Sequence, residues 1–141
     1  MPGPAWWKTK RPDCEGRPLD LLLAALDVKE SVSSGTALLI TDMISDYEYV
    51  DGEAVFGSAL PAAGNIALLR ERAENADVPV VFVNDNFGAW RNDFASTVQM
   101  AKASKRGLQI VDLLPPSPED YHVLKPQRSG FFATPLDLLL R

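Results

Sequence analysis

Apolar residues along this chain gather in short continuous runs, separated by longer stretches in which apolar and polar residues mix. Three runs have the sequences ALLIT (37–41), PVVFVN (79–84) and YHVLK (121–125). Short runs that are rich in β-branched and aromatic residues are typical of strands, and continuously apolar ones are typical of buried parallel strands. The pattern therefore predicts three strands.

The stretches between these runs repeat their apolar residues with helical spacing. Residues 60–77 predict a helix between the first two strands. Its apolar face is expected to comprise Ile66, Leu69, Ala73 and Ala76, opposite Arg70, Glu71 and Glu74. A further helix is expected to begin at Asp93 as N-cap and to end at Gly107.

Two more helices are predicted near the ends of the sequence. Residues 18–30 read PLDLLLAALDVKE, in which Pro18 suits a first helical turn. Residues 133–141 read ATPLDLLLR, in which Thr134 is the expected N-cap and Pro135 the first helical residue.

The order of the predicted elements is helix, strand, helix, strand, helix, strand, helix. This alternation predicts an α/β fold, a doubly wound parallel sheet of Rossmann-like type with helices on both faces. We expect residues 1–17 to form a flexible arm and residues 18–141 to form one domain. The last helix should lead to a fourth strand, which the sequence does not contain. We therefore expect a domain that is incomplete at its C-terminus and truncated to about three strands.

Composition narrows the class of protein. The chain has 141 residues, 46% of them hydrophobic, and a net charge of -5, which argues against nucleic acid as a partner. The first residues contain no apolar segment typical of a signal peptide, and no run approaches the roughly 18 apolar residues of a membrane span. The single cysteine, Cys14, excludes an internal disulfide. We expect a cytoplasmic protein with no membrane partner.

The candidate chemistry lies where the predicted strands end. Asp42, Asp85 and Lys125 follow or close the three strands, and ligands of open α/β sheets bind beyond the carboxyl ends of strands. A partly buried carboxylate at such a place suits general acid–base work. The alternative for Asp42 is a local Asx-turn or a helix cap that closes the strand.

Other polar residues carry weaker signals. We expect Asp46 to be a turn residue, His122 to be structural, and Cys14 to be an unreactive surface thiol. One histidine and one cysteine exclude a histidine-rich metal site, although Asp42 and Asp85 together would suit a hard cation. No phosphate-binding loop is present, and the sequence predicts no cofactor.

Three segments, taken in order, resemble the isochorismatase-like cysteine hydrolase family, which includes nicotinamidases and related amidases. They read ALLITDMISDYEY, PVVFVNDNFGAWRNDF and VLKPQRSGFFATPLDLLL, and the similarity covers roughly residues 36–141. The resemblance implies a six-stranded parallel sheet in the order 3-2-1-4-5-6. It also implies a triad of aspartate, lysine and cysteine, in which Asp42 and Lys125 match the first two positions.

The resemblance further implies a mechanism. Asp42 would take the proton of a cysteine thiol, and Lys125 would hold the charges and help to lower the thiol pKa. The thiolate would attack a small-molecule amide or a related C–N bond. The family cysteine follows the fourth strand and would therefore lie beyond Arg141, and Cys14 matches no family motif. We expect the chain as given to be inactive.

The loop after the second strand is the expected place of substrate contacts. By position in the family, Asn86, Phe87, Trp90 and Arg91 would line the mouth of a pocket, although core packing is the favoured alternative for Trp90. Metal-dependent members carry histidines near this strand, and their absence here predicts a site without metal. We expect Phe131 and Phe132 to be packing residues.

Two alternative functions remain open from the sequence. One is vinyl-ether hydrolysis of the isochorismatase kind, with Asp42 as general acid and no need for a cysteine. The other is a non-catalytic fragment that binds a partner chain. Without a fourth strand, residues 37–41 would form an exposed sheet edge, so we expect self-association. The family commonly forms homo-oligomers, and the sequence does not identify the small-molecule substrate.

Overall fold

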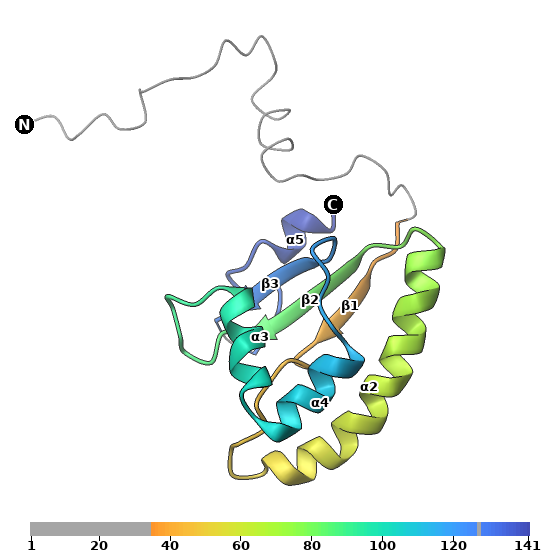
Figure 1. Cartoon of the computed structure of the whole chain (residues 1–141). Coiled ribbons are helices and arrows are strands. Elements are labelled where there is room, and N and C mark those ends of the chain that lie inside the picture. The colour runs from red at the N-terminus through yellow and green to blue at the C-terminus, as the bar shows by residue number, and fades with distance from the viewer. Residues whose placement is uncertain (1–34, 127) are drawn as a thin grey trace, which may run out of the picture. The chain divides into compact units, whose positions relative to one another are not determined.

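The computed structural model describes residues 35–126 and 128–141, and its centre is a parallel three-stranded sheet (Figure 1). The strands lie in the order β1-β2-β3 and comprise β1 (Leu38–Thr41), β2 (Val80–Asp85) and β3 (Tyr121–Lys125). All three predicted strands are confirmed, and the α/β class with them. The arm predicted at 1–17 and the helix predicted at 18–30 lie outside the described residues.

Four helices flank this sheet within the described residues: α2 (Gly52–Asn75), α3 (Phe94–Lys102), α4 (Lys105–Leu113) and α5 (Leu136–Leu139). The helix α2 begins at Gly52, eight residues before the predicted start at residue 60, and ends at Asn75, two residues before the predicted end. Gly52 lies against the main chain of Tyr47, where a Cβ atom would come within 2.1 Å of the carbonyl oxygen. The close approach of loop and helix therefore requires a glycine at this position.

The predicted helix after Asp93 is divided into two helices. Its start is confirmed, because the Asp93 side chain accepts a hydrogen bond from Ser96 N at 2.8 Å. Its predicted end at Gly107 is wrong. The helix α3 ends earlier, and Ser104 caps α4 by accepting a hydrogen bond from Gly107 N at 2.9 Å. Gly107 instead lets α4 approach the main chain, since a Cβ there would lie 2.5 Å from Ser45 O.

The C-terminal helix also begins slightly later than predicted. Pro135 occupies the N-cap position of α5, and Thr134 precedes it. The Thr134 hydroxyl accepts a hydrogen bond from Leu136 N at 3.3 Å and donates one to Gly130 O. Thr134 therefore supports the start of α5 from one residue outside the predicted position.

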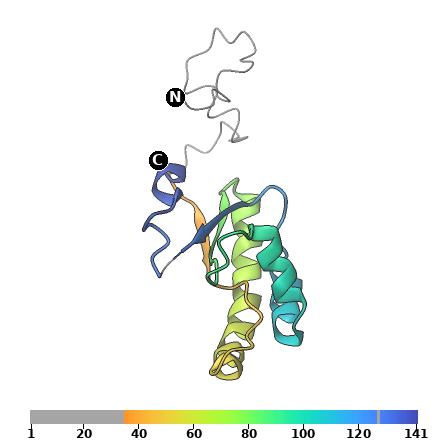
Figure 2. The same ribbon diagram turned by 90° about the vertical axis from the view of Figure 1, so that its left-hand side faces the viewer.

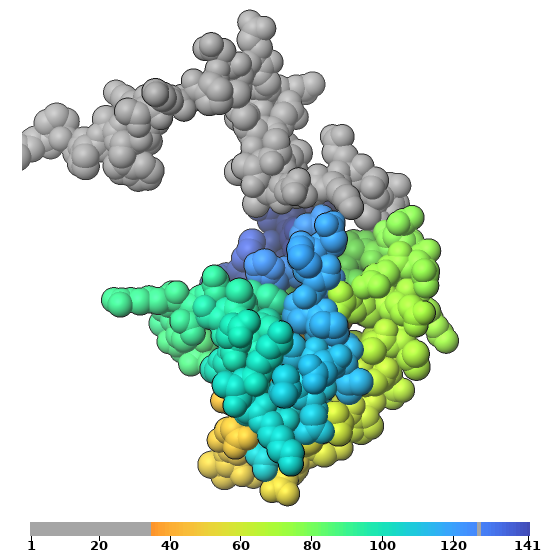
Figure 3. Space-filling model, in the orientation of Figure 1, coloured from red at the N-terminus to blue at the C-terminus, as the bar shows by residue number. Residues whose placement is uncertain are grey.

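The helices cover the two faces of the sheet unequally. Figure 2 shows α2, α3 and α4 on one side of the strands and the segment that leads to α5 on the other. In the space-filling view the three long helices hide most of the sheet (Figure 3). The core beneath them consists of Ile40, Ile44, Tyr47, Ala63, Ala73, Val80, Phe82, Phe94, Ala101, Ile110, Val111 and Leu114. On the opposite face, Val81, Val83 and Val123 pack against Leu136 of α5.

The predicted apolar face of α2 is only partly correct. Ala73 is buried, but Leu69 is 48% exposed and Arg70 is buried. The Arg70 guanidinium binds Asp120 at 2.9 Å and Glu74 at 2.8 Å. Since a charge can be buried when it is paired, this network turns Arg70 inward. No helix in the described part of the chain has the length and apolar character that a membrane span requires.

Candidate active site

Lys125, Asp42 and Asp85 meet at the carboxyl end of the sheet. Lys125 Nζ lies 3.0 Å from Asp42 Oδ1 and 3.6 Å from Asp85 Oδ2. The register explains the meeting, because Asp85 is paired with Lys125 across β2 and β3. The chain after β1 continues along β2, since Asp42 N donates a hydrogen bond to Val83 O at 2.9 Å. Three residues far apart in sequence therefore share one strand-end site, as the sequence predicted.

Burial differs sharply among the three side chains. The Lys125 side chain is 3% exposed, whereas those of Asp42 and Asp85 are 49% and 37% exposed. A buried ammonium group is tolerated when carboxylates pair with it. The cluster therefore has a cation at its base and two carboxylates that reach solvent, where they can exchange protons with a ligand.

Asp42 adopts a backbone conformation that most residues avoid. Its φ angle is 56°, in the left-handed region that aspartate tolerates better than most residues. Its carboxylate accepts a hydrogen bond from Asp85 N at 3.2 Å, across 43 residues of sequence. The local Asx-turn proposed as the alternative is therefore not what the structure shows. Asp46 does form such a turn, accepting from Glu48 N at 3.1 Å, as predicted.

Asn84 anchors the loop that carries Asp42, and sequence reasoning missed it. Its amide nitrogen donates to Ile44 O at 2.9 Å, and its carbonyl oxygen accepts from Ile44 N at 3.1 Å. The side chain is 1% exposed, so these bonds have no competition from water. The available signal was an asparagine at the end of the apolar run VVFVN (80–84).

Tyr47 closes the same loop on the side of the helical core. Its hydroxyl donates to Met43 O at 2.9 Å, and its ring is 2% exposed. Burial raises the pKa of Tyr47 to about 12, and the charges of Tyr49 and Asp42 add to the effect. The hydroxyl therefore stays protonated at neutral pH and serves as a fixed donor to the loop.

The predicted pocket-mouth residues form a turn beside the cluster. Asn86 is buried and structural: its backbone N donates to Lys125 O at 3.1 Å, and its side chain accepts from Gly88 N at 2.9 Å. Phe87 is 46% exposed, and its N donates to Asp85 Oδ1 at 2.6 Å. Arg91 is exposed, and the core packing favoured for Trp90 is wrong because this ring is 77% exposed.

A cavity of about 460 Å³ opens next to the cluster, and its lining differs from the predicted residues. The lining comprises Asp85, Arg128, Ser129 and Phe132. Phe131 and Phe132 are 56% and 60% exposed, so the expectation that they pack in the interior is wrong. Arg128 and Ser129 were not singled out from the sequence, although they follow Lys125 closely.

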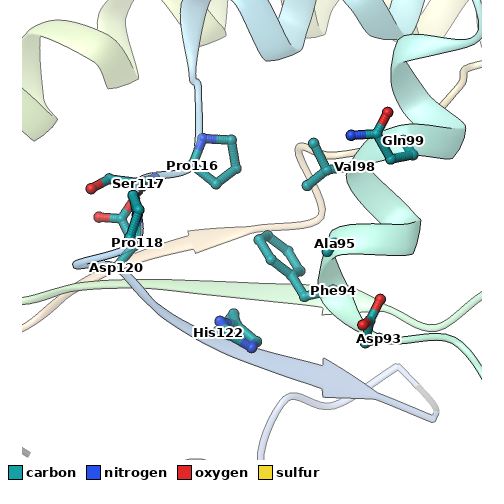
Figure 4. Close-up of a pocket in the computed structure, with 10 residues that line it drawn as sticks. All are labelled: Asp93, Phe94, Ala95, Val98, Gln99, Pro116, Ser117, Pro118, Asp120 and His122. Carbon is teal, nitrogen blue, oxygen red and sulfur yellow. Dashed lines mark hydrogen bonds between the residues drawn. The ribbon is translucent and has the colours of Figure 1, made fainter. Parts of the chain in front are cut away.

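His122 lies apart from the cluster. Its ring stacks on Phe94 with centroids 5.0 Å apart and planes inclined by 11°. Both rings line a separate cavity of about 420 Å³ between α3 and the segment before β3, as Figure 4 shows. Asp42, Asp85 and Lys125 do not line this cavity. The stacking agrees with the structural role expected for this histidine.

The hard-cation alternative at Asp42 and Asp85 does not fit the geometry. The Lys125 ammonium lies within 4 Å of both carboxylates and takes the place that a metal ion would need. Across residues 35–126 and 128–141, no group of three or more His, Cys, Asp or Glu side chains is placed to hold a metal. The donor set therefore favours proton chemistry over metal binding.

Comparison with known proteins identifies the family of the chain. The family model described as the isochorismatase domain matches residues 36–141. An uncharacterized isochorismatase family protein, YaaI of Bacillus subtilis (strain 168), is 33% identical over 104 residues, which are 74% of this chain and 57% of that protein. The chain thus spans little more than half the length of this relative. On these matches and on its α/β fold, the chain belongs to the isochorismatase family.

Proposed function

We propose that Asp42 and Lys125 form the acid–base pair of a cysteine hydrolase that cleaves a small-molecule amide or a related C–N bond. The observation that carries this proposal is the buried Lys125 ammonium, 3.0 Å from Asp42 and 3.6 Å from Asp85. Burying such a charge costs free energy even when it is paired. Its place at the carboxyl ends of parallel strands is where open α/β sheets bind their ligands.

In the proposed reaction, the Asp42 carboxylate takes the thiol proton while Lys125 stays charged and stabilises the thiolate. The thiolate attacks the carbonyl carbon of the substrate, and a C–S bond forms. The C–N bond then breaks as Asp42 returns its proton to the leaving nitrogen. Water attacks the resulting thioester, which releases the acid and restores the thiol.

The nucleophile of this reaction is not among the described residues. The single cysteine of the sequence, Cys14, lies outside them and precedes Asp42. Following the family resemblance, we place the thiol in a segment beyond residue 141, so that the chain alone is inactive. The 57% coverage of the relative from B. subtilis leaves room for such a segment.

The test starts with the polypeptide from its natural source, captured by an antibody against this sequence. Its intact mass is measured by mass spectrometry and compared with the 15.4 kDa of the chain. Ammonia release from a panel of small amides is then measured. Asp42→Asn and Lys125→Met should each lower the rate by at least about a hundred-fold, since each removes a group of the acid–base pair. The exposed controls Asp112→Asn and Lys102→Met should not. Wild-type-like rates in Asp42→Asn would overturn the proposal.

A second candidate is vinyl-ether hydrolysis, with Asp42 as general acid. One observation favours it: the Asp42 carboxylate is half exposed and can reach a ligand directly. An enolpyruvyl ether would release pyruvate under this mechanism. Pyruvate release that survives thiol alkylation but is lost in Asp42→Asn would select this activity over the amidase.

A further inference from the structure

The cavity between α3 and the segment that leads into β3 lies apart from the strand-end cluster. It encloses about 420 Å³, a volume typical of sites for small molecules. In Figure 4, α3 forms one side of the cavity, residues 116–120 form the other, and His122 of β3 lies at the base of the gap. Asp42, Asp85 and Lys125 do not line it. The chemistry proposed for the cluster therefore does not account for this cavity.

Two stacked rings give the cavity a flat surface. The ring of His122 lies on that of Phe94 with centroids 5.0 Å apart and planes inclined by 11°. Phe94 is 7% exposed and is fixed in the core, whereas His122 is exposed and faces the ligand space. Since aromatic rings pack well in offset stacks, the pair can accept a further ring. The remaining apolar residues of the lining are Ala95, Val98, Pro116 and Pro118.

Asp93 places an available carboxylate oxygen at the rim of this cavity. Its Oδ1 accepts hydrogen bonds from Ser96 Oγ at 2.6 Å and from Ser96 N at 2.8 Å. These bonds, that of the hydroxyl first, hold the pKa of Asp93 below its usual value, so the group is ionised at neutral pH. Among the described residues no donor reaches Oδ2, and no lysine or arginine lines the cavity. The second oxygen is therefore available to a cation.

Asp120 is the other carboxylate of the lining, and its charge is already balanced. Its Oδ2 accepts from Arg70 Nη2 at 2.9 Å and from Ser117 N at 2.6 Å, and its side chain is 7% exposed. The buried guanidinium thus compensates Asp120 within the fold. Asp93 is left as the uncompensated charge at the cavity, so a positively charged ligand is favoured over a negatively charged one.

We propose that this cavity binds a small aromatic amine in its cationic form. The ring of the ligand packs on the stack of His122 and Phe94, and its ammonium group approaches Asp93 Oδ2. Because the rim is open to water, the ion pair contributes a modest preference for the charge, and the apolar walls contribute the rest of the binding. The inference does not rest on the proposed function, since the cavity and the cluster share no residue.

Two matched probes test this site by NMR titration of the chain at pH 8 and low ionic strength. One is benzylamine, which is protonated at this pH, and the other is benzyl alcohol, its neutral analogue of similar shape. His122 is the one histidine of the sequence, so its ring signals report binding at this cavity. Both probes should shift these signals, and benzylamine should bind about three- to five-fold more tightly. Added salt should reduce that preference. Unshifted His122 signals, or equal affinities of the two probes, would overturn the proposal.

Variants assign the charge preference to Asp93 and the binding to the cavity. Asp93→Asn should abolish the preference but keep the helix cap, because asparagine caps a helix as well as aspartate does. Asp112→Asn, at an exposed position of α4, makes the same change in net charge and should keep the preference. Ala95→Trp, at an exposed position of α3, should fill the cavity and abolish the shifts with both probes. A preference that persists in Asp93→Asn, or binding that persists in Ala95→Trp, would contradict the proposal. Circular dichroism checks that each variant is folded.

The same probes keep this inference separate from the proposed function. Asp42→Asn should leave the affinities of both probes unchanged, because Asp42 does not line this cavity. If the preference for benzylamine holds but the natural polypeptide hydrolyses no amide, the amine site stands and the amidase proposal fails. If amides are hydrolysed but neither probe shifts the His122 signals, the amine site fails and the amidase proposal stands.

Discussion

The two faces of the sheet are built from similar side chains but are covered very differently. Twelve buried residues form the core under α2, α3 and α4, whereas four form the cluster under α5. Adjacent residues of β1 show the contrast, because Ile40 is 2% exposed on the covered face and Leu39 is 36% exposed on the other. Apolar character alone therefore does not decide burial; the elements that pack on each face do.

The two sides of the candidate site are also packed to different degrees. Its loop, with Ile44 and Tyr47, belongs to the covered face, and both residues lie in the larger core. The segment that follows β3, with Arg128 and Phe132, leads to α5 and is mostly exposed. The cluster is thus held from a well-packed side, while Asp85 borders the sparsely packed segment after β3.

The largest expected effect is a core truncation that contrasts the two faces. Phe82→Ala removes a 1% exposed ring under the three helices and should lower the free energy of unfolding by about 3–5 kcal/mol. Leu136→Ala removes an equally buried side chain from the smaller cluster and should lower the free energy of unfolding by about 2 kcal/mol. The loss is smaller because the short α5 can relax into the space left by the deleted side chain. Urea unfolding measures both. A larger loss in Leu136→Ala would contradict the comparison.

Sequence reasoning recovered the strands well because each is a short, strongly apolar run. β3 coincides with the predicted residues, 121–125. Helix faces were less predictable, since Arg70 is turned inward by Asp120, a partner 50 residues away. Such a partner leaves no mark in the local periodicity of α2.

At the site, too, residues with a local sequence signal were predicted, and residues whose partners are distant in sequence were not. The strand ends and the family resemblance pointed to Asp42 and Lys125. Asn84 went unnoticed because its role depends on the loop at Ile44, 40 residues away, which is not visible in local spacing. Ser104 and Gly107 likewise needed the packing of α4 against Ser45 to be understood.

A second prediction uses alkaline pH to lower the stability that Tyr47 contributes on the helix-covered face of the sheet. The pKa of Tyr47 is raised from 10.0 to about 12, so its contribution to stability is fully present below pH 10 and is lost as pH rises toward 12. The loss should reach about 2–3 kcal/mol. Urea unfolding between pH 8 and 11.5 should show the decline begin, and the exposed control Tyr49→Phe should decline in parallel with wild type.

Tyr47→Phe isolates the cause of that decline. At pH 8 the variant should be about 1 kcal/mol less stable than wild type, because Met43 O loses its donor. Above pH 10 the difference should shrink, since the variant has no phenol to ionise. A constant difference across the range would show that ionisation of Tyr47 does not drive the alkaline decline.

A third, somewhat smaller effect is expected at the anchor of the Asp42 loop. Asn84→Ala leaves the buried N and O of Ile44 without partners and should cost about 2 kcal/mol. The Ile44 amide should also exchange its hydrogen faster, which NMR can follow. Asn65→Ala, at an exposed position of α2, should change stability by less than about 0.5 kcal/mol. Unchanged exchange at Ile44 would refute the anchoring role.

The smallest effect on stability is expected at β1, the strand at the unpaired edge of the sheet. Within the described residues β1 pairs only with β2, so its other edge is free to pair with a second chain. We propose that the chain self-associates through this edge, with a dissociation constant visible in sedimentation velocity across micromolar concentrations. Leu39→Lys places a charge beside the edge and should weaken association about ten-fold while leaving the monomer's stability nearly unchanged, because Leu39 is already 36% exposed. Leu138→Lys, on the exposed side of α5, should associate as wild type does. A chain that stays monomeric at every concentration would show that the unpaired edge of β1 does not create an interface.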